Sequence, residues 1–236
     1  MWFTEISVVN KIGRITPNGV ITEYSLPKSN GGPTGITAGP DGNFWFGWWS
    51  YGAGSLIGKI TTSGVVTEYP LPTYLAVPND IITGPDGNLW FTEFEGDKIG
   101  KITTSGTITE YPLPKKNSRP NGIAASPDGN LWFTENKADK IGRITTDGAI
   151  TEYSPPRGAG DLGSIAAGPD GDMWFTDYAD DKIGKITPGG AITQYSVPLP
   201  RHILGGITAG PDDDMWFTEE DGIAKITTVS EPSAVN

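Results

Sequence analysis

Cysteine is absent from this chain of 236 residues, and histidine occurs once, at His202. Without thiols the chain forms no disulfide, no thiolate metal site and no cysteine nucleophile. A histidine-rich metal motif, a phosphate loop and a dinucleotide fingerprint are also missing from the sequence. Acidic residues outnumber basic ones by 28 to 17, which gives a formal charge of −11. This balance argues against nucleic acid and anionic membranes as partners, because both are bound through basic patches.

Long apolar runs and helical periodicity are missing as well. No stretch reaches the roughly 18 apolar residues of a membrane-spanning helix, so we expect no membrane partner and, by default, a cytoplasmic location. The absence of a 3.6-residue period predicts an all-β fold. The 33 glycines and 20 prolines recur at fixed offsets, so they indicate turns rather than disorder.

What the chain has is an internal repeat of about 42 residues, and such a repeat is the strongest indication of fold in any sequence. Six aligned tryptophans mark it: Trp2, Trp45, Trp90, Trp132, Trp174 and Trp216. Around Trp90, Trp132, Trp174 and Trp216 the text is nearly the same, a Leu or Met followed by Trp-Phe-Thr and an acid. Because the repeat is unbroken, we predict a single domain over residues 1–236.

One unit predicts four short strands, which we name A to D. They are Ile81–Thr83, Leu89–Glu93, Ile99–Thr103 and Thr107–Tyr111, separated by turns such as Pro85-Asp86-Gly87-Asn88. Strand B is apolar on both faces and therefore needs cover on both sides. Radially stacked four-stranded blades supply that cover, so the sequence predicts a β-propeller with six blade signatures.

The two ends of the chain fall inside a unit. The first residues belong to strand B, with Met1 at the position that Met173 and Met215 fill in later units. The last recognisable strand is strand C at Ile223–Thr228. We therefore expect three strands, four full blades and three strands, 22 in all, in a chain whose N-terminus is truncated. Incomplete first and last blades leave open edges, so we expect either a strained closed monomer or, in preference, self-association through this seam.

Four motifs recur together: Trp-Phe-Thr-Glu, Lys-Ile-Gly-Lys-Ile, Thr-Glu-Tyr-x-Leu-Pro and Gly-Ile-Thr-x-Gly-Pro-Asp-Gly. With them the chain resembles the streptogramin B lyase family, also called virginiamycin B lyase, over essentially its whole length. The resemblance implies a seven-bladed propeller that opens a cyclic depsipeptide antibiotic by elimination at its ester bond, with histidines as acid and base and Mg²⁺ as cofactor. By the same analogy this chain lacks six N-terminal strands, so it is a truncated family member.

The family's catalytic histidines precede strand A of late blades, and the matching positions carry no histidine. They are Thr34, Asn79, Asn121, Gly163 and Gly205. A family carboxylate in the last blade maps onto Glu220. Since an elimination needs a base near neutral pKa and an acid, the resemblance favours the family's fold over its activity.

Three groups of residues are candidates for a site on the rim formed by the D–A and B–C loops. His202, with Glu220, is either a displaced acid or base or an exposed loop residue. The acids that end strand B are either a Mg²⁺ site or solvated partners of the following lysines Lys98, Lys140 and Lys182. These acids are Glu5, Glu93, Glu135, Asp177 and Glu219, of which the last four are the predicted metal ligands.

The third group lies where the second unit departs from the repeat, at Phe46-Gly47-Trp48-Trp49-Ser50-Tyr51-Gly52. The sequence predicts a glycine-rich loop in which Trp48, Trp49 and Tyr51 bind a small-molecule or peptide ligand. The alternative is that these aromatics pack against a neighbouring blade.

Two functions with different mechanisms therefore remain open. One is a lyase acting on a cyclic depsipeptide through His202, Glu220 and the acids. The other is a non-catalytic propeller that binds a ligand or serves as a scaffold.

Overall fold

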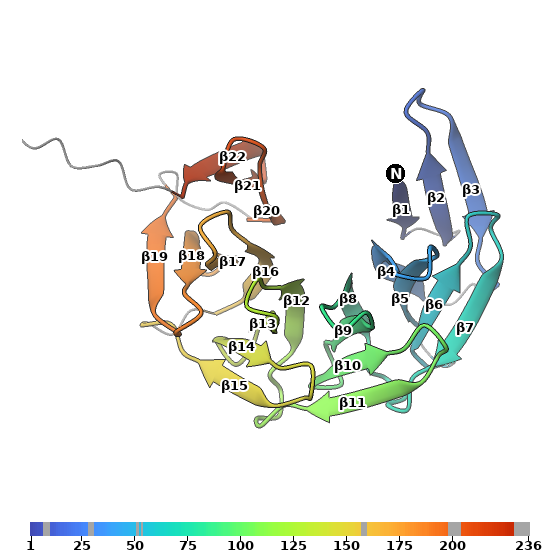
Figure 1. The fold of residues 1–236 in the computed structure, drawn as a ribbon, viewed down its shortest axis with the longest axis horizontal. Helices are drawn as coiled ribbons and strands as arrows, with labels where there is room; N and C mark the ends of the chain where they lie inside the picture. Colours follow the sequence, from blue (N-terminus) through green and yellow to red (C-terminus); the bar gives the residue numbers. More distant parts are fainter. Residues whose placement is uncertain are drawn as a thin grey trace, which may run out of the picture. The chain divides into compact units, whose positions relative to one another are not determined.

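The computed structural model describes residues 1–6, 10–27, 31–50, 52, 54–156, 160–197 and 204–228 (Figure 1). They fall into two compact units, Met1–Ile123 and Ala124–Asn236, which are described one after the other. The single domain thus stays a prediction. Within the described residues no helix is long and apolar enough to cross a membrane.

The first unit contains three blades and the beginning of the first strand of the fourth blade (Figure 1). Its first blade has strands β1 (Trp2–Glu5), β2 (Lys11–Ile15) and β3 (Ile21–Ser25). The second has β4 (Gly32–Ala38), β5 (Phe44–Trp49), β6 (Leu56–Ile60) and β7 (Val66–Pro70). The third has β8 (Pro78–Thr83), β9 (Leu89–Glu93), β10 (Lys98–Ile102) and β11 (Ile108–Pro112).

The boundary between the units falls inside β12. The fourth blade has β12 (Pro120–Ala125), β13 (Leu131–Glu135), β14 (Lys140–Ile144) and β15 (Ile150–Tyr153). The fifth has β16 (Leu162–Ala167), β17 (Met173–Asp177), β18 (Lys182–Ile186) and β19 (Ile192–Ser196). The sixth has β20 (Ile207–Ala209), β21 (Asp214–Glu219) and β22 (Gly222–Thr227).

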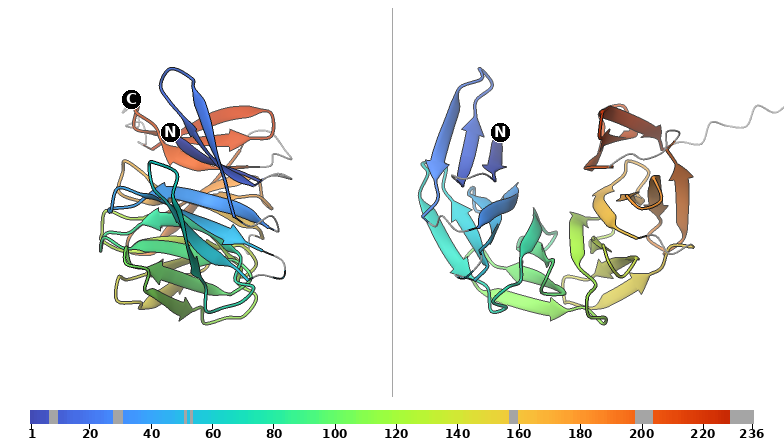
Figure 2. Two further views of the ribbon diagram at one scale, coloured as in Figure 1. Left: turned by 90° about the vertical axis from the view of Figure 1, so that its right-hand side faces the viewer. Right: turned by 180° about the vertical axis from the view of Figure 1, so that it is seen from behind.

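Each blade is an antiparallel sheet whose strands follow one another in chain order, and the blades twist as two further views show (Figure 2). The first and last sheets have three strands and the other four sheets have four. The predicted all-β propeller blades, with strands B-C-D first and A-B-C last, are therefore confirmed.

Consecutive blades share a core. In the first unit Trp45 of β5 packs with Leu89 and Phe91 of β9. In the second unit Trp132 of β13 packs with Phe175 of β17. The tryptophan of strand B thus faces the following blade while the flanking residues face the preceding blade. The prediction that strand B is covered on both faces is confirmed.

Within a blade the phenylalanine of strand B lies over a glycine of strand C. Gly100 is the cross-strand partner of Phe91, and a Cβ atom on Gly100 would overlap the Phe91 ring. The same overlap recurs at Gly13 with Phe3, Gly58 with Phe46, Gly142 with Phe133 and Gly184 with Phe175. In these five blades the glycine of the motif serves close packing rather than a turn, whereas the last blade has Ala224 opposite Phe217.

The core tryptophans are held by their own blades. A strand D tyrosine stacks on each of five tryptophans, with ring centroids 5.4 to 5.8 Å apart. The turn carboxylate four residues earlier accepts the indole N–H in four blades, in the pairs Trp45–Asp41, Trp90–Asp86, Trp174–Asp170 and Trp216–Asp212. Trp132 is different, because its buried indole nitrogen has no hydrogen-bond partner in the described part of the chain.

Strand A begins earlier than predicted. In the third blade it starts at Pro78 instead of Ile81, and the register with β9 shifts between these two residues. The same irregularity lies between Pro33 and Ile36 in β4 and between Leu162 and Ile165 in β16. A β-bulge of this kind interrupts the ladder and redirects the side chains that it contains.

Candidate functional site at the strand A bulges and the strand B ends

The bulges contain the positions at which the resemblance places catalytic histidines. Thr34, Asn79 and Gly163 each lie between the paired residues that bracket a bulge. Asn121 is the second residue of β12, and Gly205 precedes β20 by two residues. The structure therefore puts these five positions at the start of strand A, where a bulge or a strand end aims side chains away from the ladder.

In the first unit these polar side chains bind one another across blades. Asn79 Nδ2 donates hydrogen bonds to Asn121 Oδ1 at 2.6 Å and to the Asn121 carbonyl at 3.3 Å. Thr92 Oγ1 donates to the same carbonyl at 2.8 Å, and Thr34 Oγ1 donates to the Pro78 carbonyl at 2.7 Å. The amides and hydroxyls fix one blade to the next and offer no group that titrates near neutral pH.

Asp80, next to Asn79, is the buried acid of this network. Its carboxylate accepts the backbone N–H of Ile81 at 2.9 Å and of Ile123 at 3.1 Å. Burial raises the pKa of Asp80 to about 6, although the two backbone N–H groups oppose the rise. Its two donors belong to strand A of two blades, so this acid is built into the blade interface.

In the second unit the matching positions are glycines whose side-chain space is already filled. A Cβ atom on Gly163 would overlap the ring and hydroxyl of Tyr178, and one on Gly205 would overlap the hydroxyl of Thr218. A histidine at either position could not be accommodated unless these neighbours moved. The sequence showed that histidine was missing there, but it did not show that the space was closed.

Three of the acids that end strand B are buried, which corrects the expectation of solvated residues. Glu93, Glu135 and Asp177 have no exposed surface. The following lysines also have other partners, because Lys98 pairs with Glu110, Lys140 with Glu152 and Lys182 with Asp180. The reason is that strand B lies between two blades, whereas a lysine ammonium stays near solvent and reaches an outer carboxylate instead.

Glu93 is the extreme case. Both of its carboxylate oxygens are buried without a hydrogen-bond donor among the described residues. Burial raises the pKa of Glu93 to about 8, with the Glu110 carboxylate adding to the rise and the Lys98 ammonium opposing it. Asp177 accepts a hydrogen bond from Gln194 Nε2 at 3.1 Å, and burial raises its pKa to about 6. Burial thus shifts the pKa of two of the predicted metal ligands upward, and the larger rise is at Glu93.

Among the described residues no three histidine, cysteine, aspartate or glutamate side chains form a group that could hold a metal ion. Glu219 is half-buried at the end of β21, and Glu220 is exposed in the turn that follows. His202 and Tyr51 lie outside the described residues.

Trp48 is not in a loop, which corrects the prediction for the irregular unit. Strand β5 runs from Phe44 to Trp49, and Trp48 is 2% exposed in the core with Ile12 and Leu56. In the repeat Trp48 takes the place that Glu93 has in the third blade, since both are the fourth residue after the residue that opens strand B. A large apolar side chain replaces a buried acid, so the strand continues and the aromatic packs against the preceding blade.

Trp49, by contrast, lines a hollow of about 560 Å³ with Leu75, Val77, Phe94 and Glu95. All five residues belong to the first unit. The other four residues of this hollow were not predicted from the sequence. A signal was available for Phe94, because it holds the same repeat position as Trp49, directly after the strand B acid or its replacement.

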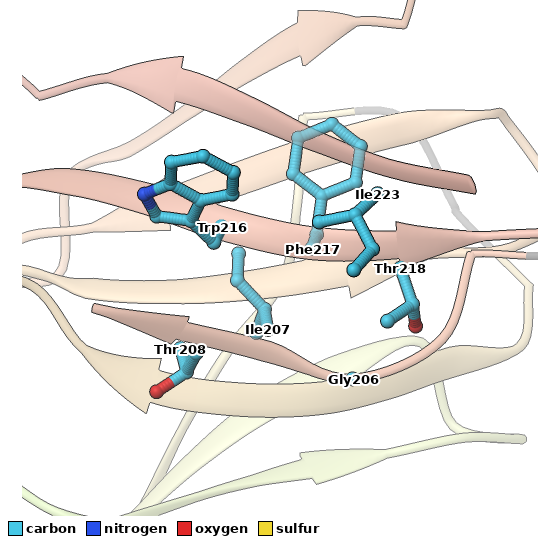
Figure 3. Close-up of a pocket in the computed structure, with 7 residues that line it drawn as sticks. All are labelled: Gly206, Ile207, Thr208, Trp216, Phe217, Thr218 and Ile223. Atoms are coloured by element: carbon cyan, nitrogen blue, oxygen red, sulfur yellow. The ribbon is translucent and has the colours of Figure 1, made fainter. Parts of the chain in front are cut away.

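A second hollow, of about 420 Å³, lies on the last blade (Figure 3). It is lined by Ile207, Trp216, Thr218 and Ile223, among others. Ile223 is 71% exposed, whereas Ile183 at the same position of the preceding blade is 1% exposed. This hollow is therefore the side of the sixth blade that, in other blades, the next blade covers.

Repeated four-stranded blades with bulged inner strands define a propeller whose loops carry the candidate site. The chain belongs to the virginiamycin B lyase family, because the model of that family matches residues 1–161 and 155–235. A solved streptogramin B lyase is 42% identical with a TM-score of 0.89, covering 95% of this chain and 74% of that chain.

Two further solved structures extend the comparison. A catalytically inactive histidine-to-alanine variant of the Staphylococcus aureus virginiamycin B lyase, with quinupristin, is 40% identical with a TM-score of 0.84, covering 92% of this chain and 77% of that chain. A gluconolactonase from Xanthomonas campestris has a TM-score of 0.61 at 16% identity, covering 90% of this chain and 77% of that chain, and shows the fold alone. No curated protein matches the sequence.

Proposed function

We propose that this chain is a ligand-binding member of the family, which holds a small-molecule or peptide ligand at the rim of the D–A and B–C loops without the histidine-dependent elimination. One observation carries the proposal. The five positions that match the family's histidines are Thr34, Asn79, Asn121, Gly163 and Gly205, and the space beside Gly163 is filled by Tyr178.

The chemistry supports separating binding from turnover. An elimination at an ester needs a base for the proton and an acid for the leaving oxygen, and each positioned group contributes roughly 10²- to 10⁴-fold. The Staphylococcus aureus relative with one histidine replaced is described as catalytically inactive, with quinupristin. We infer that a propeller of this family can present a binding rim without turning over what it binds.

The test is incubation with a streptogramin B antibiotic, with and without Mg²⁺, followed by mass spectrometry for the linearised product and calorimetry for binding. Mg²⁺ enters the assay because the family resemblance implies it. We expect binding without product above the buffer control. Turnover comparable with that of a histidine-bearing relative, lost in His202→Ala, would overturn the proposal.

The second candidate is an active lyase, and the acidic end of β21 favours it. Glu219 and Glu220 follow Trp216 in the last blade, where the resemblance places a catalytic carboxylate. The same assay decides, because Glu220→Gln would then reduce turnover by about 10²-fold or more. An unchanged rate would exclude this carboxylate.

A third candidate is a scaffold that associates with its own copies, and the open faces of the end blades favour it. Ile223 on the last blade and Met1 and Ile21 on the first are large apolar side chains that are mostly exposed. Exposed apolar patches mark interaction surfaces. This candidate is compatible with ligand binding, because the faces and the rim are different surfaces of a blade.

A further inference from the structure

The hollow at Trp49 has the size and lining of a ligand pocket. Its volume of about 560 Å³ lies within the range of roughly 300 to 1,000 Å³ for small-molecule sites. Trp49, Leu75, Val77 and Phe94 make it apolar, and Glu95 is the charged residue of its lining. Three separate segments supply these walls: the end of β5, the connection from β7 to β8 and the loop after β9.

Trp49, which forms one wall of the hollow, is held in place by strand pairing and by its buried neighbour. Trp49 is the last residue of β5 and pairs with Gly32 of β4, while its neighbour Trp48 is buried in the core. The position of Trp49 holds Phe94 and Tyr178 in two other blades but Ile6, Asn136 and Glu220 in the rest, so the repeat does not demand an aromatic there. Packing in the core accounts for the tryptophan at position 48. It does not account for Trp49, whose half-buried ring lines the hollow.

Phe94, which forms another wall of the hollow, is held in place by a contact with Arg119. The guanidinium of Arg119 lies 5.3 Å from the centre of the Phe94 ring. The loop that carries Arg119 is held by the Asp97 carboxylate, which accepts the backbone N–H of Asn117 at 2.6 Å, of Ser118 at 2.8 Å and of Arg119 at 3.1 Å. Both aromatic walls are therefore preorganised before a ligand arrives, which lowers the free-energy cost of binding.

The charge at the mouth of this hollow is neutralised. Arg119 pairs with Glu95 at 3.1 Å, and both side chains are partly exposed. A ligand with a net charge next to Phe94 would compete with one member of this pair for the other. A neutral group leaves the pair intact, so the electrostatics favour an uncharged ligand group.

We propose that the hollow lined by Trp49, Leu75, Val77 and Phe94 binds an uncharged aromatic group of a ligand. An aromatic ring stacks on the two preformed aromatic walls and buries its apolar surface against the aliphatic ones. This inference deepens the proposed function and rests on it, since it names the part of the ligand that the rim recognises.

The experiment uses N-acetyl-L-phenylalaninamide as the probe and N-acetyl-L-alaninamide as its matched control. Binding to the full chain is followed by chemical-shift changes of the tryptophan indole N–H signals. We expect millimolar binding of the aromatic amide and none of the alanine amide. Phenylacetate and phenethylammonium are expected to bind more weakly than the neutral probe. Equal binding of the aromatic and the alanine amides would overturn the proposal.

Variants locate the site. Trp49→Ala and Leu75→Asp should each weaken binding about tenfold or more, whereas Trp49→Phe should keep it within about threefold, since tenfold corresponds to one lost apolar contact of about 1.4 kcal/mol. Leu75 is half exposed, so its replacement leaves the fold intact even if Trp49→Ala does not. Ile223→Ala, in the apolar hollow of the other unit, is the control and should bind normally. Normal binding in Trp49→Ala and Leu75→Asp, or loss in Ile223→Ala, would place the site elsewhere.

The same variants separate this inference from the proposed function. If a streptogramin B antibiotic binds the wild-type chain but Trp49→Ala and Leu75→Asp bind it equally well, the pocket assignment is wrong and the proposed function stands. If the aromatic amide binds at Trp49 but the antibiotic does not bind, the pocket is right and the antibiotic class is wrong. If neither binds, both fail.

Discussion

The acid that ends strand B shows how far a single residue can depart from its usual state in this fold. Glu93 is fully buried, with neither oxygen hydrogen-bonded in the described part of the chain and a pKa raised to about 8. The repeat predicts an acid here, but not its burial. Burial depends on how closely a neighbouring blade packs against strand B, and no local sequence pattern encodes this packing.

Replacing this acid should change how stability depends on pH. The folded state holds the Glu93 proton up to about pH 8, whereas the unfolded chain releases it near 4.5. The folded state therefore binds more protons between these values, and stability falls as pH rises through this window. Glu93→Gln removes this dependence. In urea denaturation, the free energy of unfolding of the variant should therefore rise relative to that of the wild type between pH 5 and pH 8. The gain should be on the order of 1 to 4 kcal/mol, at about 1.4 kcal/mol per pKa unit.

The control is Asp147→Asn, which removes one charge from an exposed turn. Its difference from the wild type should stay flat over the same pH range. A flat difference for Glu93→Gln as well would mean that the acid is ionised and solvated in the folded chain.

The closed space beside Gly163 gives a second prediction for single residues. Gly163→Ala places a Cβ atom within the Tyr178 ring, and moving that ring should cost about 1 to 3 kcal/mol in free energy of unfolding. Because the clash is between these two residues, Tyr178→Ala should remove most of it. The double variant would then be more stable than the sum of the two single changes. Strict additivity in a denaturation cycle would contradict the packing described here.

At the level of strands, the turn residues made the number and order of the strands predictable. Some strand bounds were not predictable, because they depend on tertiary packing. Strand B of the third blade was predicted at Leu89–Glu93, and β9 has those bounds. Strand A was predicted too short, because its first residues belong to a bulge whose pairing is irregular. The segment around Trp48 was predicted to be a loop because it is rich in glycine. It is strand instead, because Trp48 is buried in a core that includes the neighbouring blade. Trp49 lines a hollow, and the other residues that line it come from two other segments.

The glycine of strand C should be among the least replaceable residues of a blade. In Gly100→Ala the new Cβ atom meets the Phe91 ring, which is itself enclosed between blades. We expect a loss of about 1 to 3 kcal/mol, measured by chemical denaturation. Gly222→Ala is the matched control at the start of the last strand C, where no heavy atom lies within 4 Å of the added Cβ. Equal losses in the two variants would show that backbone entropy, and not the ring, determines the cost.

The tryptophan of strand B should dominate the stability of its blade interface. Trp132 is fully buried and packs with Ile165 and Phe175 of the following blade. Trp132→Ala leaves a large cavity and should cost about 3 to 5 kcal/mol. Thermal and urea denaturation measure the loss. A loss below about 1 kcal/mol would mean that the interface is much looser than described.

For the molecule as a whole, the formal charge of −11 opposes any association that exposed apolar side chains such as Ile223 favour. Raising the salt from about 10 mM to about 1 M shortens the screening length from roughly 30 Å to 3 Å. If copies associate through the last blade, the mass measured by light scattering should rise above 25.1 kDa with salt. Ile223→Glu should abolish the rise, while Val65→Glu, on an exposed turn, should not. A mass of 25.1 kDa at every salt concentration would exclude this mode of association.

The hydrogen bond from the core indole to its own turn gives the fourth blade, which lacks it in the described residues, a spectroscopic signature of its own. Trp45, Trp90 and Trp174 donate to a carboxylate four residues earlier, whereas the buried Trp132 indole has no partner in the described residues. The Trp132 indole N–H signal should therefore differ in chemical shift and in hydrogen-exchange rate from those of Trp45, Trp90 and Trp174. Since stacked repeats contact only their neighbours, exchange under mild denaturant should report the order in which individual blades open.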